Sequence, residues 1–336
     1  MRNQRWAALA LGLSVTASAW PITIGGGGDP IPVDFSQTYD LTAAPATAAA
    51  TYLVENGKAK NVTKVGIASF CVGLVYGKGV SGNSSGGSLS FTQTQTAVFP
   101  GGIPTGRLLT VADTMYDQLE ADLKAAGFEV VPHEQLAAMP AFQKFAGKMV
   151  TDAQLVKENI DLGKGKSAAN LVLVTSPKQL PFLKDCRAET PGTLMAKARL
   201  PYEKDLAGIT LMTVVVTLDF AKPVAGGGFW QGAKADLQYG EYLPSSRTAN
   251  VVSVFNNGSG ATYWLKQSLV PAENPFKEGG TGAVKRSGEY NDLTGESTRT
   301  TETEIKVDAD HDLWFRNAEA LTKSLSAMYV ARLKGQ

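Results

Sequence analysis

The chain has few of the side chains that most often carry catalysis or bind metals. Among its 336 residues there are two histidines, His133 and His311, and two cysteines, Cys71 and Cys186. A His-rich zinc site is not expected from so few ligands. A hydrolase triad built on either histidine is not favoured, because the order of elements that such a triad requires is missing. The sequence therefore favours a non-enzymatic protein that carries no cofactor.

The sequence also lacks a charge excess and a long apolar run. Lys and Arg number 32 and Asp and Glu number 31, whereas a nucleic-acid binder needs a cationic excess to displace counterions. No segment reaches about eighteen consecutive apolar residues, so no transmembrane helix is expected. Apolar residues at 43% and charged residues at 19% are typical of a globular protein.

Residues 1–19 have the pattern of a secretory signal peptide. MRNQR supplies two arginines, WAALALGLSVTA is a short apolar core, and the Ala-Ser-Ala that ends at Ala19 matches a cleavage site. Cleavage is expected after Ala19, and no cysteine lies near that point to accept a lipid. The sequence thus predicts an exported protein, periplasmic or extracellular, with association with an outer membrane as a further option.

In an exported protein the two cysteines are candidates for a disulfide. Oxidising compartments preserve such bonds, and a bridge between Cys71 and Cys186 would close a long loop in the chain. Cys71 also lies in the apolar run GIASFCVGLVYG, where a free cysteine is often simply buried. Both interpretations stay open from the sequence alone.

The pattern of elements predicts an α+β fold, with a mixed sheet packed on helices, an antiparallel β-rich C-terminal half and a closing helix. Residues 20–60 are interpreted as an extended lead-in, whose later part forms a short helix ending at Asn56–Gly57. Residues 61–207 are expected to form an α/β module. Residues 208–336 are expected to form a β-rich region with the C-terminal helix, packed with that module.

Within the α/β module, KVGIASFCVGLVYG and SLSFTQTQTAVF predict the two strands of a long hairpin. TVADTMYDQLEADLKAAG predicts a helix that is capped by Thr110 and ended by Gly127. PHEQLAAMPAFQKF and TDAQLVKENIDLG predict two more short helical segments, and AANLVLVTS predicts a buried strand.

The C-terminal half is expected to be mainly antiparallel. GITLMTVVVTLDF alternates with a period of two, and ANVVSVFNNGSGATYWLKQSLV predicts two strands joined at Asn257–Gly258. The segment from Glu273 to Lys306 is polar and Gly-rich and is interpreted as a long exposed loop. A helix from about Asp312 carries an apolar stripe that consists of Trp314, Ala318, Leu321, Leu325 and Met328.

Aromatic residues gather in the β-rich region, and the most prominent are Trp230, Tyr239, Tyr242, Tyr263 and Trp264. Such rings could line a surface that binds a glycan or a peptide. Cross-strand packing also explains them and is the favoured interpretation, because strands are rich in aromatic pairs.

The stretch DADHDLWFRNAE resembles part of a calcium loop. Carboxylates occupy the first, third, fifth and twelfth places of that loop, namely Asp308, Asp310, Asp312 and Glu319. Leu313 holds the sixth place, which normally requires glycine. Because the helical stripe begins at Trp314, we interpret Asp310 or Asp312 as a helix cap and expect no metal site.

Four segments resemble the curli-secretion-channel family of periplasmic α/β proteins, namely KVGIASF, MYDQLEADLKAAGFEVVPHEQLAA, NLVLVTS and NAEALTKSLSAMYVARL. The resemblance implies an exported α/β domain closed by a C-terminal helix. Channel-type members assemble as rings and contribute strand hairpins to the outer membrane. This chain departs from that type, since it has no lipid-attachment cysteine and SLSFTQTQTAVF has Gln where lipid would be.

We therefore expect an exported, non-enzymatic envelope protein involved in secretion, assembly or envelope structure. A homo-oligomer and partners in the envelope or in secretion are consistent with this expectation. Two alternatives stay open. One is a ligand-binding module that uses the aromatic face, and the other is an exported hydrolase that uses carboxylates or His311.

Overall fold

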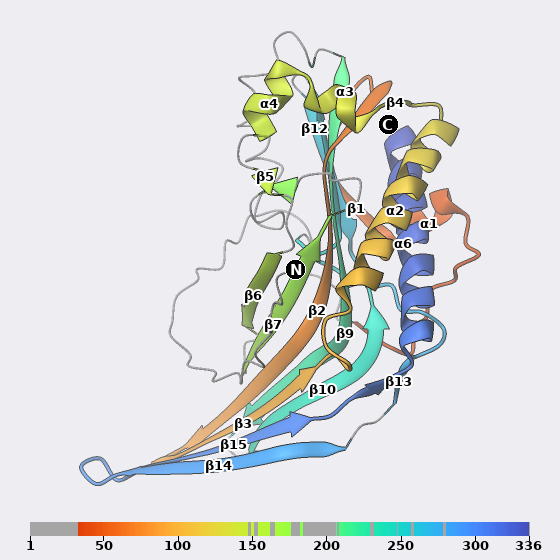
Figure 1. Ribbon diagram of the computed structural model, residues 1–336. Coiled ribbons are helices and arrows are strands. Elements are labelled where there is room, and N and C mark those ends of the chain that lie inside the picture. The colour runs from red at the N-terminus through yellow and green to blue at the C-terminus, as the bar shows by residue number, and fades with distance from the viewer. Residues whose placement is uncertain are drawn as a thin grey trace, which may run out of the picture.

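The computed structural model describes residues 33–146, 149–150, 154–161, 165–175, 182–183, 206, 208–228, 232–246, 248–256, 259–277 and 280–335 (Figure 1). The predicted signal peptide, Cys186, Trp230 and the turn Asn257–Gly258 lie outside these residues. The α+β prediction is confirmed: a mixed parallel and antiparallel sheet packs on helices, and a long helix closes the chain.

The described helices are α1 (Pro45–Tyr52), α2 (Thr105–Ala125), α3 (His133–Ala137), α4 (Pro140–Ala146) and α6 (His311–Lys334). The strands of the large sheet are β1 (Leu53–Lys58), β2 (Lys64–Gly86), β3 (Leu89–Val98), β4 (Glu129–Val131), β6 (Gln154–Asp161), β7 (Gly165–Val174), β9 (Ile209–Gly228), β10 (Gly232–Tyr242), β11 (Val251–Asn256), β12 (Ser259–Leu265), β14 (Thr281–Asn291) and β15 (Glu296–Ile305). Two short pairs are formed by β5 (Met149–Val150) with β8 (Phe182–Leu183), and by β13 (Phe276–Lys277) with β16 (Asp308–Ala309).

Two parallel strands form the centre of the sheet. Residues 64–74 of β2 pair with residues 209–218 of β9, with one register shift after Ile67. Both strands read as nearly continuous apolar runs, which is expected where both faces of a parallel pair are covered. Strands of the predicted α/β module, residues 61–207, and of the predicted β-rich region, residues 208–336, therefore belong to one sheet.

Helices α2 and α6 cover one face of this centre and pack against each other (Figure 1). The predicted apolar stripe of α6 is confirmed, since all five of its residues are fully buried. Phe70 of β2 packs edge-on against Tyr116 of α2, with ring centroids 5.6 Å apart. A smaller cluster around Leu136 and Phe142 of α3 and α4 lies with Ile209 and Leu211 of β9.

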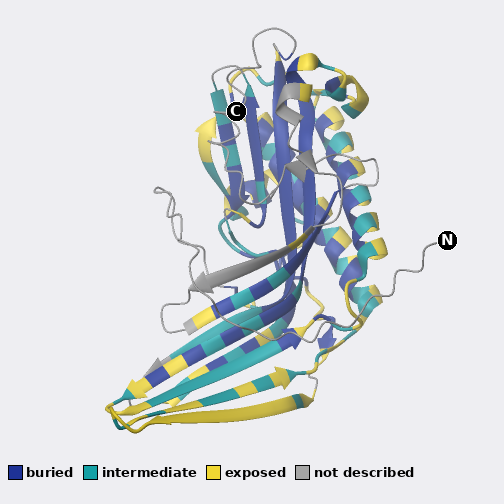
Figure 2. Cartoon of the chain, turned by 60° about the vertical axis from the view of Figure 1, so that its left-hand side comes forward, coloured by how far each residue is buried: buried dark blue, intermediate teal, exposed yellow. Residues whose placement is uncertain are grey.

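Beyond Leu74 the strand β2 continues away from the helices and forms a long extension, which we call the arm. Its main layer consists of residues 77–86 of β2, with β3, β15 and β14 in that order on one side and β7 and β6 on the other side as far as Gly82. A second layer consists of the end of β9, from Asp219, and β10. Figure 2 shows that burial falls steadily from the core to the outer strands of the arm.

The predicted hairpin of β2 and β3 is confirmed, with Gly86 opposite Leu89. The strands β7, β9, β11 and β12 are also where the sequence placed them, whereas the segment PHEQLAAMPAFQKF, predicted as one short helix, forms two, α3 and α4. Gly127, with a φ of +93°, ends the α2 turn as predicted.

Several local predictions are wrong. Helix α2 begins at Thr105, and Thr110 lies inside it, donating its hydroxyl to the Gly106 carbonyl. Asn56–Gly57 belongs to β1 and does not end α1, because this segment pairs with β12. The segment QLVKENID forms strand β6, because pairing with β7 overrides its local helical preference.

The interpretation of residues 273–306 as a loop is also wrong. Residues 281–305 of this segment are mostly exposed, but they form the β14–β15 hairpin, and β15 pairs in parallel with β3. Phe276, in β13, is buried. The many threonines of the hairpin favour strands. The polar strand β15 joins the edge of β3, whose side chains alternate with a period of two.

The two layers of the arm approach each other closely at Gly82 of β2. A Cβ at this position would lie 1.9 Å from the Lys234 carbonyl oxygen and 2.7 Å from that of Gly226. Gly79, three residues earlier, has ordinary space, with its nearest neighbour 3.5 Å from a Cβ. Gly82 is therefore needed for the layers to pack.

We predict that Gly82→Ala destabilises the protein by about 1–3 kcal/mol, because the backbones of β9 and β10 must move away from β2. Gly79→Ala is the matched control and should change stability by less than about 1 kcal/mol. Urea unfolding of both variants measures the difference. Equal stability of the two variants would contradict this packing.

Candidate functional site

The arm is the most unusual feature of the described chain. In β3 the residues Leu89, Phe91, Gln93, Gln95 and Ala97 share the face turned toward β9 and β10, as the period-two pattern predicted. The Gln95 side chain accepts a hydrogen bond from the Leu237 amide of β10 at 3.1 Å. The two glutamines of this face therefore lie at the contact between the layers.

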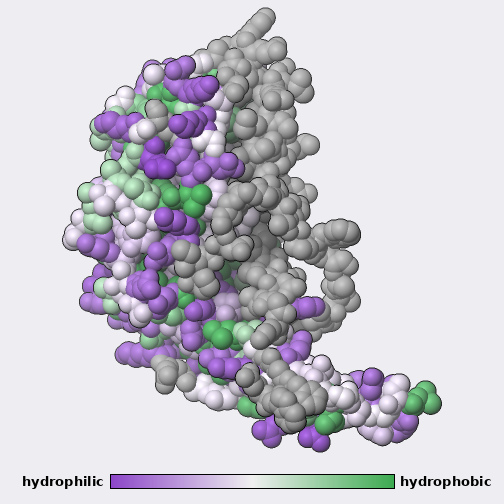
Figure 3. Space-filling model, turned by 180° about the vertical axis from the view of Figure 1, so that it is seen from behind, coloured by the Kyte–Doolittle hydropathy of each residue, from purple (hydrophilic) through white to green (hydrophobic). Residues whose placement is uncertain are grey.

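The outer strands β15 and β14 extend beyond the covering layer. The opposite face of the main layer is almost entirely polar, and its residues include Ser90, Thr92, Thr94, Ser287, Thr298 and Thr300. The covered face continues onto exposed apolar residues, of which Leu89 is 45%, Val284 47% and Tyr290 67% exposed. Figure 3 shows this mixture of polar and apolar residues along the arm.

A buried ion pair lies at the root of the arm, where β9 leaves β2. The Lys78 ammonium of β2 contacts the Asp219 carboxylate of β9, and their side chains are 4% and 6% exposed. The Tyr242 hydroxyl donates to Asp219 Oδ2 at 3.0 Å and lies 3.3 Å from Lys78 Nζ. Burial, with the adjacent Asp219, raises the pKa of the Tyr242 hydroxyl.

Asp219 also replaces hydrogen bonds that the strand loses at this point. Its Oδ1 accepts from the backbone amides of Phe220 and Ala221, at 2.8 and 3.2 Å. Buried backbone amides require partners, and β9 has no β2 partner after Leu218. The carboxylate therefore stabilises the separation of the two strands.

Asn250 acts in the same way on the other edge of β9. Its side chain accepts from the Thr217 amide at 3.1 Å and donates to the Thr217 carbonyl at 3.3 Å. It also donates to the Pro244 carbonyl at 2.8 Å. Because β11 pairs with β9 only as far as Val215, the fully buried Asn250 extends the ladder by one residue.

We predict that Lys78→Met destabilises the protein by about 3–5 kcal/mol, because it leaves the Asp219 carboxylate buried without its cation. Adding Asp219→Asn should recover part of this loss, since the uncompensated charge is then removed. Chemical denaturation of the two single variants and the double variant completes the cycle. Simple additivity of the two changes would rule out the coupling.

Glu241 of β10 is a second buried carboxyl group, and no cation pairs with it in the described part of the chain. It is 1% exposed, and neither carboxylate oxygen has a hydrogen-bond partner among the described residues. Burial raises the pKa of Glu241 well above its usual range. The Asn317 side chain acts in the opposite direction and lowers the pKa of Glu241. The amide nitrogen of Asn317 donates to the Glu273 carbonyl at 2.9 Å.

A raised pKa in the folded state makes the folding free energy depend on pH. The contribution of Glu241 is most favourable below the pKa of the unfolded chain, about 4.3, and is lost as pH rises toward the folded pKa. Glu241→Gln should therefore be more stable than the wild type at about pH 7, with the difference shrinking toward about pH 4. Urea unfolding across this range measures it, and a constant difference would contradict the assignment.

The calcium-like residues do not converge. Asp310 is the N-cap of α6 and accepts from the Leu313 amide at 2.9 Å, which confirms the capping interpretation. This hydrogen bond lowers the pKa of Asp310. Asp308 lies in β16 and Asp312 pairs with Arg107 at 2.8 Å, while Glu319 lies more than one turn further along α6. Among the described residues no group of three or more metal-ligating side chains comes together.

The aromatic residues in the described part of the β-rich region are largely interior. Tyr242, Tyr263 and Trp264 are 4%, 0% and 5% exposed, and Tyr239 is partly buried. Burial raises the pKa values of Tyr239 and Tyr263. These side chains pack between strands and helices, so they offer little surface to a glycan or peptide.

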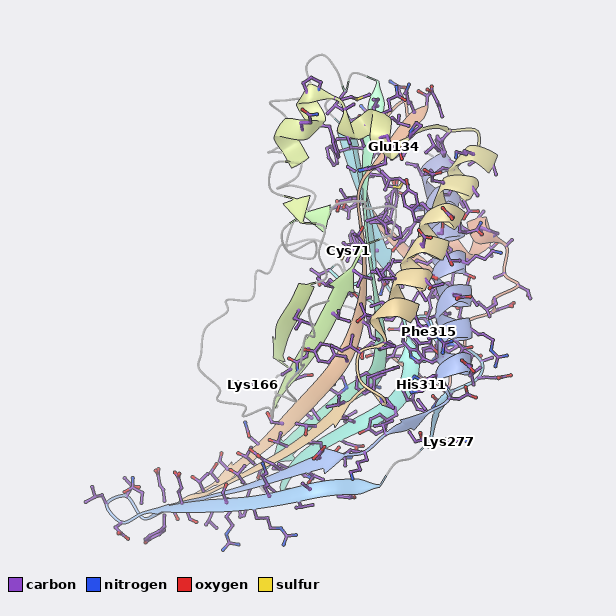
Figure 4. All side chains as sticks on the ribbon, in the orientation of Figure 1. Cys71, Glu134, Lys166, Lys277, His311 and Phe315 are labelled. Carbon is purple, nitrogen blue, oxygen red and sulfur yellow. The ribbon has the colours of Figure 1, made fainter. Side chains whose placement is uncertain are left out.

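The two histidines lie in different environments. The His311 ring packs edge-on against Phe99, with centroids 5.7 Å apart, at the start of α6 (Figure 4). His133 is half-buried, and burial lowers its pKa. Its Nδ1 has no hydrogen-bond partner within the described part of the chain. Neither ring is placed between a nucleophile and a carboxylate by any of these contacts.

Cys71 lies in the centre of β2, fully buried, on the face opposite Phe70 and α2. It carries a disulfide. Cys186 lies outside the described residues, so the Cys71–Cys186 pairing stays a prediction.

A pocket of about 390 Å³ lies near the C-terminal ends of α2 and α6, lined by residues that include Asn61, Thr63, Phe128 and Leu333. None of the candidate site residues from the sequence lines it. No described helix is long and apolar enough to cross a membrane.

Comparison with known proteins gives no relative for this chain. No family model matches the sequence, and neither a curated protein nor a solved structure resembles it closely enough to match.

Proposed function

We propose that this chain is an exported, non-enzymatic envelope protein that serves assembly, secretion or envelope structure. The observation that carries the proposal is the arm, a long two-layered sheet that projects from the helical core and ends in exposed strands (Figures 1 and 2). Such a projection offers backbone edges and side chains to a partner. The signal-peptide pattern of residues 1–19 supports a partner outside the cytoplasm.

The resemblance to the curli-secretion-channel family agrees with this proposal at the level of architecture. The segments that carry the resemblance lie in β2, α2, β4, α3, β7 and α6. The polar outer strands of the arm favour contact with protein or water over contact with lipid chains. The proposal therefore includes the domain architecture of this family and does not include the formation of a membrane pore.

The two alternatives receive less support. The described aromatic rings of the ligand-binding hypothesis are largely buried. For the hydrolase hypothesis, the His311 ring packs on Phe99 and the Asp312 carboxylate pairs with Arg107. The first contact packs the start of α6 on the segment after β3, and the second joins it to the start of α2.

Export is tested by expressing the full chain in a Gram-negative host and fractionating the cells. We expect the mature protein outside the cytoplasm, with Trp20 as its first residue. Replacing Arg2 and Arg5 by Glu should retain the uncleaved chain in the cytoplasm, whereas the same change at Lys58 and Lys60 should leave export unaltered. A wild-type chain that stays cytoplasmic and uncleaved would refute the proposal.

A further inference from the structure

Strand β14 is the outer strand of the arm and has an open edge. It spans Thr281–Asn291 and pairs with β15 on one side, with no strand on the other among the described residues. All side chains from Ala283 to Asn291 are exposed, and Figure 4 shows side chains standing out on both faces of this strand. An exposed edge of this length is a template for pairing with another strand.

The sequence of β14 is complementary to itself in one antiparallel register. A two-fold axis perpendicular to the sheet at Ser287 places residues at equal distances from Ser287 opposite each other, on the same face. Lys285 then faces Glu289 of the second copy, and the symmetry repeats this pair. On the other face Val284 meets Tyr290 of the second copy, again twice.

Neighbouring registers lack this complementarity. An axis at Arg286 or at Glu289 places two identical charges opposite each other. An axis at Gly288 brings Lys285 opposite Asn291 and forms no pair of opposite charges. The regular pairing of β14 with β15 over residues 284–291 means that the whole matching segment is a continuous strand.

We propose that two copies of this chain join edge to edge through β14, in the register centred on Ser287, and form one continuous sheet. Cross-strand pairs of opposite charge and of apolar side chains stabilise such an edge, and main-chain hydrogen bonds add to them. Within each copy Glu302 of β15 lies opposite Lys285. The dimer therefore extends an alternation of charge from Glu302 through Lys285 to Glu289 of the second copy.

This inference does not depend on the proposed function, because an exported envelope protein could equally be a monomer. It concerns a symmetric pair, in which each copy contributes the same strand. A ring would need a different arrangement, in which β14 meets another edge of the next copy.

The charge pairs are tested with Glu289→Lys. Within the chain Glu289 lies opposite Thr298, so the change spares the hairpin but brings Lys285 against a second lysine across the dimer. Sedimentation or light scattering over the micromolar range should show a dimer for the wild type and at least about tenfold weaker association for the variant. Glu304→Lys, on the inner strand β15, is the control with the same charge change and should associate like the wild type.

The position of the axis is tested with Ser287→Cys. Opposite residues in an antiparallel pair have Cα atoms about 4.5–5.5 Å apart, within the range of a disulfide. Mild oxidation should therefore link two copies of Ser287→Cys, whereas Thr294→Cys, at the hairpin tip, should stay unlinked. A wild type that is monomeric throughout, or a larger assembly without the link at residue 287, overturns the proposal.

Discussion

The parallel pairing of β2 with β9 is the constraint on which the rest of the structure depends. These two strands are buried between α2 and α6 on one side and the smaller α3–α4 cluster on the other. Both continue beyond the helices, but they separate after Leu218 and enter different layers of the arm. The direction of the arm is thus set inside the core, by the strands that the helices hold.

The separation of the strands requires polar groups in the interior. Asp219 and Asn250 provide side-chain partners for the backbone of β9 where β2 and β11 no longer do. Lys78 and Tyr242 then satisfy the Asp219 carboxylate. A buried charge is tolerated here because it is paired and hydrogen-bonded, and its position specifies where one sheet becomes two layers.

The sequence predicted the elements that are decided by local pattern. The 3–4 spacing from Trp314 to Met328 and the alternation of SLSFTQTQTAVF gave a correct helix and strand. It failed where strand pairing overrides local preference. β6 pairs with the neighbouring β7, β1 pairs with the distant β12, and β15 of the β14–β15 hairpin pairs with the distant β3. The roles of Asp219 and Asn250 were missed because a single polar residue in an apolar strand carries no spacing signal, although its presence in a buried run is itself a hint.

The continuity of β2 also has a mechanical meaning. Over its 23 residues the strand is held by β9 near its start, by β7 along its middle and by β3 near its end, and these pairings overlap in sequence. A pull on the far end of the arm therefore loads many parallel rows of hydrogen bonds together, in shear, and does not open them one by one. A force applied at the tip would be transmitted to the part of the sheet that packs on the helices through one continuous strand, β2.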